Sequence, residues 1–440
     1  MALKFGTDGV RGLAFKELKP EWVAKLAAAT VRATGVNRFV IGEDGRETGA
    51  VFSQALINGF TEEGASCEYL KVIPTPAIAH IATLGDFGGA VVSASHNQAE
   101  YNGVKLFLPG GKKLTDKNQD EIEKILGSAK FPDFPAQAME ISRSRDALVN
   151  SWISSLKESI SVKNLSGLSI VVDCANGAAS KIAPKLFTEL GVNVVSINDS
   201  PNGKNINLKC GSTDMSDLTE AVLDLGVDLG IAFDGDADRV LAIDNEGKLV
   251  DGDQIMAISA IDMNSRGVLH DGTVVVSVMT NFGFHLAMQD AGIKTHITPV
   301  GDRSILQALR ANNWSLGGEQ SGHIVYSEMS STGDGILTAL QLFDIVRRTN
   351  SDLHSLAQSS MRKYPQALKS VELPKEDTDI EEKLKPAIER VETLLQGEGR
   401  VLVRPSGTEP ILRIMVEAST PEEVERLSQE LVTAAKQILT

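Results

Sequence analysis

Cysteine is scarce in this chain, with three residues of this type among 440, at positions 67, 174 and 210. Three widely spaced cysteines cannot build a disulfide framework, and they lack the spacing of a zinc cluster. The N-terminus carries no apolar signal region, and no apolar run is long enough to span a bilayer. We therefore expect reduced thiols in a cytoplasmic protein without membrane segments.

Positive charge is also in deficit, since 43 Lys and Arg residues face 58 Asp and Glu residues and the net charge is −15. Nucleic acids and anionic membranes are poor partners for such a chain. Attraction for an anionic substrate must therefore be local. The motifs described below do collect basic side chains, namely Arg11, Lys105, Arg239, Arg303, Arg404 and Arg413.

The length excludes a single hydrophobic core, and alternating strand and helix patterns predict α/β domains with largely parallel sheets. Three stretches begin alike, each with an apolar strand and then a second apolar segment that ends in a polar loop. The strands span 38–42, 168–173 and 273–277, and the loops span 93–97, 234–239 and 318–323. Because ligands of open α/β sheets bind at the carboxyl ends of strands, we expect three related domains that each give one loop to a central cleft.

The C-terminal part has a different pattern. An amphipathic helix is predicted over 380–395, two strands over 400–404 and 411–417, and a helix that starts at Thr420-Pro421 with Glu423 completing the cap. This pattern predicts a smaller α+β domain. We place the four domains at 1–148, 149–249, 250–362 and 363–440.

Three carboxylates occupy alternate positions after the apolar run 229–233: Asp234, Asp236 and Asp238. Alternate side chains of an extended segment point the same way, and crowded carboxylates repel one another unless a cation neutralises them. A hard divalent ion with oxygen ligands suits this pattern, and Arg239 adds a charge suited to phosphate. The loop therefore predicts a Mg²⁺ site beside a phosphorylated ligand.

Other interpretations of this acidic loop are open. A calcium-binding EF-hand loop needs Gly and Glu where the chain has Arg239 and Asn245. An aspartyl-phosphate phosphatase would use Asp234 as nucleophile in a D-x-D-x-T pattern, but Asp238 stands in the place of the Thr. A solvated acidic loop fits poorly with apolar segments on both sides.

Ser95 lies in the polar loop 93–97, after the apolar segment 89–92. A serine at a strand end is a candidate nucleophile, although a loop serine alone is more often structural. His96 need not be its base, because adjacent side chains often point apart. Asn102-Gly103-Val104-Lys105 could bring an ammonium group back to the loop.

Three further motifs carry polar groups. The stretch 404–410, with Arg413 beyond it, combines Gly407 with hydroxyls and arginines that can cradle a phosphate, although a plain hairpin is an equal alternative. The stretch 317–323 offers groups suited to sugar hydroxyls. The stretch 5–12 places Arg11 on a glycine-rich turn.

These five segments, in this order, resemble the α-D-phosphohexomutase family, and the resemblance covers nearly the whole chain. The family pattern ASHNP with NG-x-K corresponds to 94–98 and 102–105, DGDGDR to 234–239, and R-x-SGTEP to 404–410. Gln98 departs from the Pro, which could loosen the serine loop. Ala237 replaces the second glycine of the metal loop, for which we expect an ordinary backbone angle.

The segments 173–178, 205–207, 300–303 and 318–323 resemble the branch of the family that acts on amino-sugar phosphates. The resemblance implies an isomerase that interconverts glucosamine 6-phosphate and glucosamine 1-phosphate for UDP-N-acetylglucosamine synthesis. A phosphoserine enzyme and a 1,6-bisphosphate intermediate, which is also the activator, are implied. We therefore expect a small sugar phosphate as the substrate and a monomer or homodimer as the assembly.

The resemblance also implies roles for individual residues. Catalytic roles fall on Ser95, Lys105, Arg11, His96 and Arg239. Mg²⁺ is held by Asp234, Asp236, Asp238 and an oxygen of phosphorylated Ser95. Substrate binding falls on Glu319, Ser321, His323, Arg303, Arg404, Ser406, Gly407, Thr408 and Arg413.

Three alternatives remain for the function. A phosphomannomutase or phosphoglucomutase would use the same machinery. A metal-dependent sugar phosphatase would use Asp234. A protein that only binds a metal or a sugar phosphate would have no catalytic serine.

Overall fold

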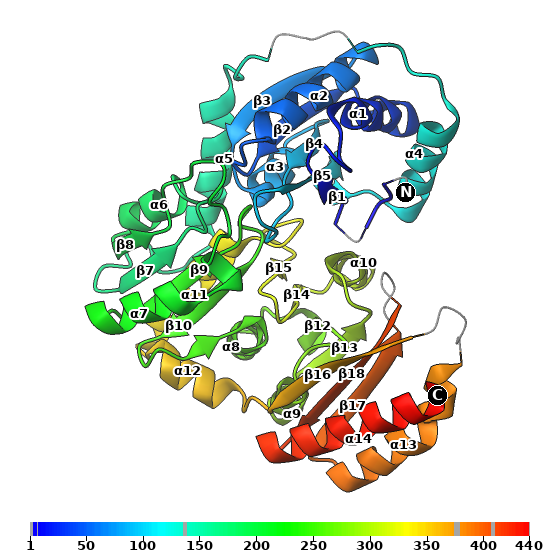
Figure 1. Cartoon of the computed structure of the whole chain (residues 1–440). Helices are drawn as coiled ribbons and strands as arrows, with labels where there is room; N and C mark the ends of the chain where they lie inside the picture. Colours follow the sequence, from blue (N-terminus) through cyan, green and yellow to red (C-terminus); the bar gives the residue numbers. More distant parts are fainter. Residues whose placement is uncertain (1–2, 7, 135–138, 374–378, 406–409, 440) are drawn as a thin grey trace. The chain divides into compact units, whose positions relative to one another are not determined.

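The computed structural model describes residues 3–6, 8–134, 139–373, 379–405 and 410–439. It divides into two compact units, one of residues 1–279 and 292–360 and the other of residues 280–291 and 361–440. The first unit contains three sheets and the second contains one (Figure 1). We describe each unit by itself.

The first sheet has the strand order β1-β5-β4-β2-β3, with β6 paired to β5. Strand β2 is parallel to β3 and β4, whereas β4 and β5 are antiparallel. Helix α1 packs against α2 and α4, and apolar side chains of α1 and α2 form a core with the sheet. The strands are β1 (Val10–Leu13), β2 (Arg38–Glu43), β3 (Ser66–Val72), β4 (Gly88–Val92), β5 (Tyr101–Leu108) and β6 (Lys112–Lys113), and the helices are α1 (Pro20–Thr34), α2 (Gly49–Glu62), α3 (Thr75–Ile81) and α4 (Asp116–Ser128).

The second sheet has the order β11-β10-β9-β7-β8 and the third has the order β13-β12-β14-β15. The second-sheet strands are β7 (Ser169–Asp173), β8 (Asn193–Ile197), β9 (Leu229–Phe233), β10 (Val240–Asp244) and β11 (Leu249–Val250), with helices α5 (Arg145–Glu158), α6 (Ala183–Glu189) and α7 (Ser216–Leu225). The third-sheet strands are β12 (Thr273–Ser277), β13 (Lys294–Thr298), β14 (Leu316–Gly318) and β15 (Ile324–Tyr326), with helices α8 (Gly252–Ser265), α10 (Asp302–Asn312), α11 (Gly335–Thr349) and α12 (Leu353–Ser360).

The three sheets repeat one topology. In each, a first strand (β2, β7 or β12) lies between two parallel neighbours, and the next strand pairs antiparallel to the second neighbour. Strands β4, β9 and β12 are buried along their whole length, as expected for sheets covered on both faces. The predicted repeat of three related α/β domains is confirmed.

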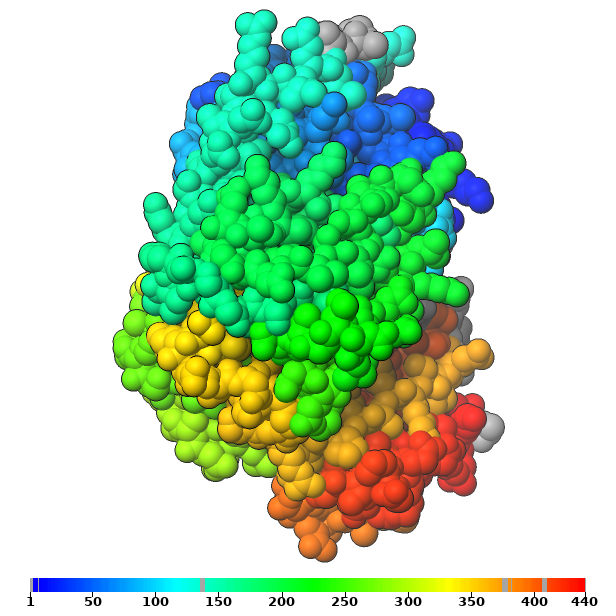
Figure 2. All heavy atoms as spheres, turned by 90° about the vertical axis from the view of Figure 1, so that its left-hand side faces the viewer, coloured from blue at the N-terminus to red at the C-terminus, as the bar shows by residue number. Residues whose placement is uncertain are grey.

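Within the first unit, helix α5 connects the second domain to the first. Helix α5 packs against α3 and β3, so the second domain joins the first through this helix. Figure 2 shows the corresponding face, where the surface of the second domain (cyan to green) continues into that of the first. Among the described residues, no helix combines the length and apolarity that a membrane crossing requires.

The second unit is the predicted α+β domain. Its antiparallel sheet has the order β16-β18-β17, and α13 has the predicted bounds. The Oγ1 of Thr420 accepts the backbone N–H of Glu423 at 3.3 Å, so the predicted helix cap is present. Two elements were not predicted, β16 and the helix α9. The elements are β16 (Gln366–Glu372), β17 (Gly399–Pro405), β18 (Ile411–Ala418), α9 (Phe282–Asp290), α13 (Ile380–Leu395) and α14 (Pro421–Leu439).

Candidate active site

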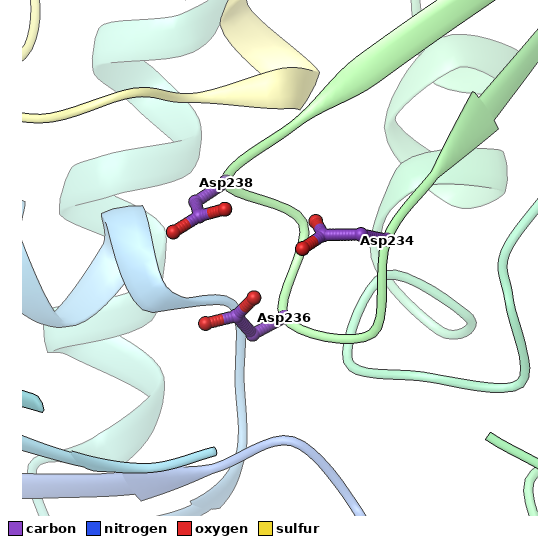
Figure 3. A group of neighbouring side chains, drawn as sticks. All are labelled: Asp234, Asp236 and Asp238. Carbon is purple, nitrogen blue, oxygen red and sulfur yellow. The ribbon is translucent and has the colours of Figure 1, made fainter. Parts of the chain in front are cut away.

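The three aspartates lie on the loop between β9 and β10, and their side chains point toward one another (Figure 3). One carboxylate oxygen from each of Asp234, Asp236 and Asp238 lies within 4.8 Å of the others. The three residues are 0%, 0% and 2% exposed. Such close carboxylates without solvent require positive charge nearby.

The loop closes through a left-handed residue. Ala237 has φ 56°, contrary to the ordinary backbone angle that we expected there. This conformation costs an alanine about 1–2 kcal/mol. The turn requires it because Ala237 donates its N–H to the carbonyl of Asp234 at 3.0 Å and accepts the N–H of Gly335 at 3.0 Å.

Lys105 supplies part of the required charge from β5. Its Nζ lies 2.7 Å from Asp236 Oδ2, 2.6 Å from Asp238 Oδ2 and 2.8 Å from Asp8 Oδ2. Burial opposes its protonation, but these three carboxylates outweigh burial and raise the pKa of Lys105 well above its usual value. The ammonium group therefore stays charged and ties the loop to the first sheet.

The remaining oxygens fit a cation. Asp236 Oδ1 and Asp238 Oδ1 are buried, and no described group lies within hydrogen-bond distance of either, although Nδ1 of His323 lies 3.6 Å from Asp238 Oδ1. Burial, together with Asp238 and Asp236, raises the pKa of Asp234 well above its usual value. Crowded, unsatisfied carboxylate oxygens are the donor set of a hard divalent cation, so these residues fit a divalent metal site.

Ser95 follows β4 and reaches this group. Its Oγ donates to Asp234 Oδ2 at 2.6 Å and lies 3.3 Å from Nδ1 of His96. The residue is fully buried and has φ 53°, in the left-handed region. Burial, then Arg239 and Arg11, lowers the pKa of His96 to about 4. The 3.3 Å contact shows that the side chain of His96 turns toward Ser95, although the side chains of adjacent residues often point apart.

A cavity of about 410 Å³ opens beside the serine loop. Within it, Glu319 Oε1 accepts the N–H of Gly301 at 3.0 Å. The Oγ of Ser321, in the same turn as Glu319, is buried and receives no hydrogen bond from a described group. The cavity is lined by five of the predicted site residues, Arg11, His96, Arg239, Glu319 and His323.

Arg303 points elsewhere in this structure. Its guanidinium contacts α4, with Nη1 at 2.9 Å from Gln119 Oε1 and Nη2 at 2.6 Å from Asp116 Oδ1. It does not line the cavity that contains Glu319. Its predicted role in substrate binding stays a prediction that would require this side chain to turn.

Sequence reasoning did not assign a role to several charged groups at the site. Lys113 contacts Asp8 Oδ1 at 2.5 Å and also pairs with Asp302. Oδ2 of Asp8 also lies 3.0 Å from Nη2 of Arg11. The motif 5–12 contained Asp8 and could have indicated it, whereas nothing in the sequence around Lys113 marks it.

The predicted phosphate loop, residues 404–410, belongs to the second unit. Ser406, Gly407 and Thr408 lie outside the described residues. Arg404 on β17 and Arg413 on β18 are direct partners across the antiparallel pair. This register places the two arginines side by side on the hairpin that leads into residues 406–409, and their predicted role in phosphate binding stays a prediction.

Four domain families match the chain in order. Their descriptions are phosphoglucomutase/phosphomannomutase alpha/beta/alpha domain I (residues 2–133), domain II (150–247), domain III (251–364) and C-terminal domain (367–434). Together they span most of the chain, from the serine loop to the hairpin with Arg404 and Arg413.

Curated relatives and solved structures agree with this assignment. The phosphoglucosamine mutase of Caldanaerobacter subterraneus is 44% identical over 98% of each chain, and that of Mycobacterium leprae is 44% identical over 99% of this chain and 95% of its own. A phosphoglucomutase/phosphomannomutase family protein from Burkholderia thailandensis has the same fold (TM-score 0.81, 21% identity, 99% and 98% covered). So does the N-acetylphosphoglucosamine mutase of Aspergillus fumigatus, solved with GlcNAc-6P and magnesium (TM-score 0.67, 18% identity, 100% and 96% covered).

At these low identities the solved structures speak for the fold alone, whereas the matched domain families and the curated relatives cover the chain nearly from end to end. The chain therefore belongs to the α-D-phosphohexomutase family and is a phosphomutase, an isomerase similar to the phosphoglucosamine mutases.

Proposed function

We propose that the protein interconverts glucosamine 6-phosphate and glucosamine 1-phosphate, with Ser95 as the carrier of the phosphoryl group. One observation carries the proposal: Ser95 Oγ contacts the buried aspartate group at 2.6 Å beside a cavity lined by Arg11 and Arg239. The amino-sugar preference is supported by relatives that are named phosphoglucosamine mutases at 44% identity.

A metal fits the aspartate group, and we assign Mg²⁺ to Asp234, Asp236 and Asp238 because their carboxylate oxygens lie close together and two of them, Asp236 Oδ1 and Asp238 Oδ1, are buried without a hydrogen-bond donor among the described groups. When bound, this ion would neutralise charge on the phosphoryl group during transfer. Magnesium is the metal named with the Aspergillus fumigatus enzyme of the same fold.

The chain's own residues then divide the work of transfer. Phosphorylated Ser95 gives its phosphoryl group to the free hydroxyl of the sugar phosphate: the serine O–P bond breaks, the sugar O–P bond forms, and the proton that the sugar hydroxyl loses ends on the Oγ of Ser95. Arg11 and Arg239 stabilise the charge spread over the phosphoryl oxygens. Lys105 keeps the acidic loop in place through its contacts to Asp236 and Asp238.

The product of this first transfer is a 1,6-bisphosphate. It turns over in the site and returns its other phosphate to Ser95, so a hexose or hexosamine 1,6-bisphosphate also activates unphosphorylated enzyme. Glu319 and Ser321 hold sugar hydroxyls in both orientations. Arg404 and Arg413, with Ser406, Gly407 and Thr408, bind the phosphate distal to Ser95.

A substrate panel tests the proposal. Purified protein with Mg²⁺ and a catalytic amount of hexose 1,6-bisphosphate receives glucosamine, glucose or mannose phosphates, and kcat/KM is compared. We expect the highest value for the amino sugar. A higher value for mannose or glucose phosphate would assign a phosphomannomutase or phosphoglucomutase, and release of inorganic phosphate without isomerisation would assign a phosphatase.

A further inference from the structure

Arg46 lies just after β2, is 3% exposed, and points its guanidinium into the serine loop. Its Nη2 donates to the carbonyls of Ser95 at 3.1 Å and Asn97 at 2.8 Å. Its Nη1 donates to the carbonyl of Tyr101 at 3.0 Å and also to that of Gln98. One side chain therefore holds four carbonyl groups of the segment that carries the serine.

The remaining contact of Arg46 closes a ring around the serine backbone. Its Nε lies 2.9 Å from Oδ2 of Asp44, which also accepts the Oγ–H of Ser93 at 2.7 Å. That Ser93 Oγ accepts the backbone N–H of Ser95 at 2.8 Å. Both the N–H and the C=O of Ser95 are therefore fixed by the same buried ion pair.

A second domain supplies the other half of the contacts. Asn207 is 4% exposed, and its Nδ2 donates to the carbonyls of Ser95 at 2.8 Å and Asn97 at 2.9 Å. These are the two carbonyls that Arg46 Nη2 also holds. A Cβ at Gly235 would lie 2.7 Å from the Ser95 carbonyl and 2.9 Å from Asn207 Nδ2, so the metal loop packs on the same contact.

The serine needs this degree of restraint because its φ of 53° is unfavourable for a side chain-bearing residue. Such a conformation persists only where the surroundings over-determine it. Neither Arg46 nor Asn207 lines the cavity with Arg11 and His96, so direct contact with the sugar does not account for them.

We propose that Arg46 and Asn207 are positioning residues that hold Ser95 with its Oγ facing Asp234. The inference rests on the proposed function, in which Ser95 carries the phosphoryl group. Because neither side chain faces the cavity, their loss lowers kcat and leaves KM for the sugar phosphate nearly unchanged. A misplaced nucleophile costs rate even when binding is intact.

The decisive variant is Asn207→Gly. Asn207 has φ 54°, which glycine adopts freely, so this change removes the amide and keeps the backbone. Asn350→Gly is the matched control, since Asn350 has φ 53° and ends α11 away from the serine loop. Arg46→Lys is the second variant, because it keeps the charge beside Asp44 and loses the planar donor array.

We expect Asn207→Gly and Arg46→Lys to lower kcat by roughly 10–100-fold with KM within about twofold, and Asn350→Gly to match the unmodified protein. Unchanged kcat in Asn207→Gly, or an increase in KM at constant kcat, overturns the proposal. If Arg46→Lys does not fold, Asn207→Gly decides alone.

Hydrogen exchange separates this proposal from the proposed function. Peptides that cover 93–103 should exchange faster in Asn207→Gly than in Asn350→Gly, also in a Ser95→Ala background where phosphoryl transfer through the serine is absent. Equal exchange overturns the positioning role. Lack of phosphate on Ser95 in the unmodified protein would overturn the proposed function, while the exchange result still tests the restraint on the loop.

Discussion

The hydroxyl of Ser95 donates a 2.6 Å hydrogen bond to Oδ2 of Asp234, a residue 139 positions further along the chain. The two residues lie at the ends of β4 and β9, which hold equivalent places in two sheets of the same topology. The site therefore arises only where two related domains meet, and both loops must be in place before the serine and the acidic group can act together.

The contact predicts that Ser95 is the phosphorylated residue. Incubation with a hexose 1,6-bisphosphate followed by peptide mass spectrometry should place the phosphate on Ser95, and Ser95→Ala should lose nearly all mutase activity. Phosphate on Asp234 instead would support the phosphatase hypothesis.

Asp236→Asn should lose most activity while the protein stays folded. The amide oxygen can still accept from Thr75 Oγ1, which donates to Asp236 at 2.5 Å, but one charged ligand of a hard cation is lost. Titration with Mn²⁺ followed by electron paramagnetic resonance should show weaker binding, and EDTA should inactivate the unmodified enzyme.

Asp224→Asn is the matched control for this variant, since Asp224 is an exposed carboxylate on α7. It should bind Mn²⁺ and turn over like the unmodified protein. Full turnover in EDTA, or equal Mn²⁺ affinity in Asp236→Asn, would contradict the metal assignment.

Arg404→Gln combined with Arg413→Gln should raise KM for the sugar phosphate by about 10-fold or more, because two charge-assisted contacts to phosphate are lost. Ser95 phosphorylation and metal binding should persist, because those groups belong to the first unit. Arg426→Gln, an exposed change on α14, is the control. An unchanged KM in the double variant would identify 404–410 as a structural hairpin.

Glu417 should be a main determinant of the stability of the second unit. It is fully buried and lies 2.5 Å from Arg400 Nε, and it also accepts from Asn281 Nδ2 at 2.9 Å and the Phe282 N–H at 3.1 Å. Glu417→Ala leaves these donors unsatisfied and should lower the free energy of unfolding by about 3–5 kcal/mol in denaturant titrations.

The comparison for that prediction is Glu425→Ala. Glu425 pairs with Lys369 at 2.6 Å, but its side chain is 69% exposed. Loss of such a surface pair should change the free energy of unfolding by less than about 1 kcal/mol. Equal effects of the two variants would show that the buried contacts of Glu417 contribute no more to the free energy of unfolding than an exposed ion pair does.

The sequence predicts most of the fold because its strands are short apolar runs followed by polar loops. The run 229–233 coincides with β9, and the predicted helix 380–395 coincides with α13. Strand β16 is not predicted, because it is not an apolar run: its exposed and half-buried residues alternate beside charged neighbours. Helix α9 gives no local sign that it belongs with residues 361–440, because contacts such as Asn281 to Glu417 join distant parts of the chain.

The sequence likewise predicts some residues of the site and not others. The aspartates and Ser95 can be found because alternation and strand ends are local patterns. Arg46, Asn207 and Lys113 cannot, because their roles depend on hydrogen bonds and ion pairs to residues that are distant in the sequence. The left-handed Ala237 also escapes prediction, since the turn imposes a conformation that alanine does not favour.

The role of Ser95 in the mutase reaction is tested by following the phosphate with ³¹P nuclear magnetic resonance. Purified protein receives glucosamine 6-phosphate, Mg²⁺ and a catalytic amount of 1,6-bisphosphate. We expect the resonance of glucosamine 1-phosphate to appear without accumulation of inorganic phosphate, and we expect no such resonance with Ser95→Ala. Inorganic phosphate as the only product, or wild-type conversion by Ser95→Ala, would contradict this role.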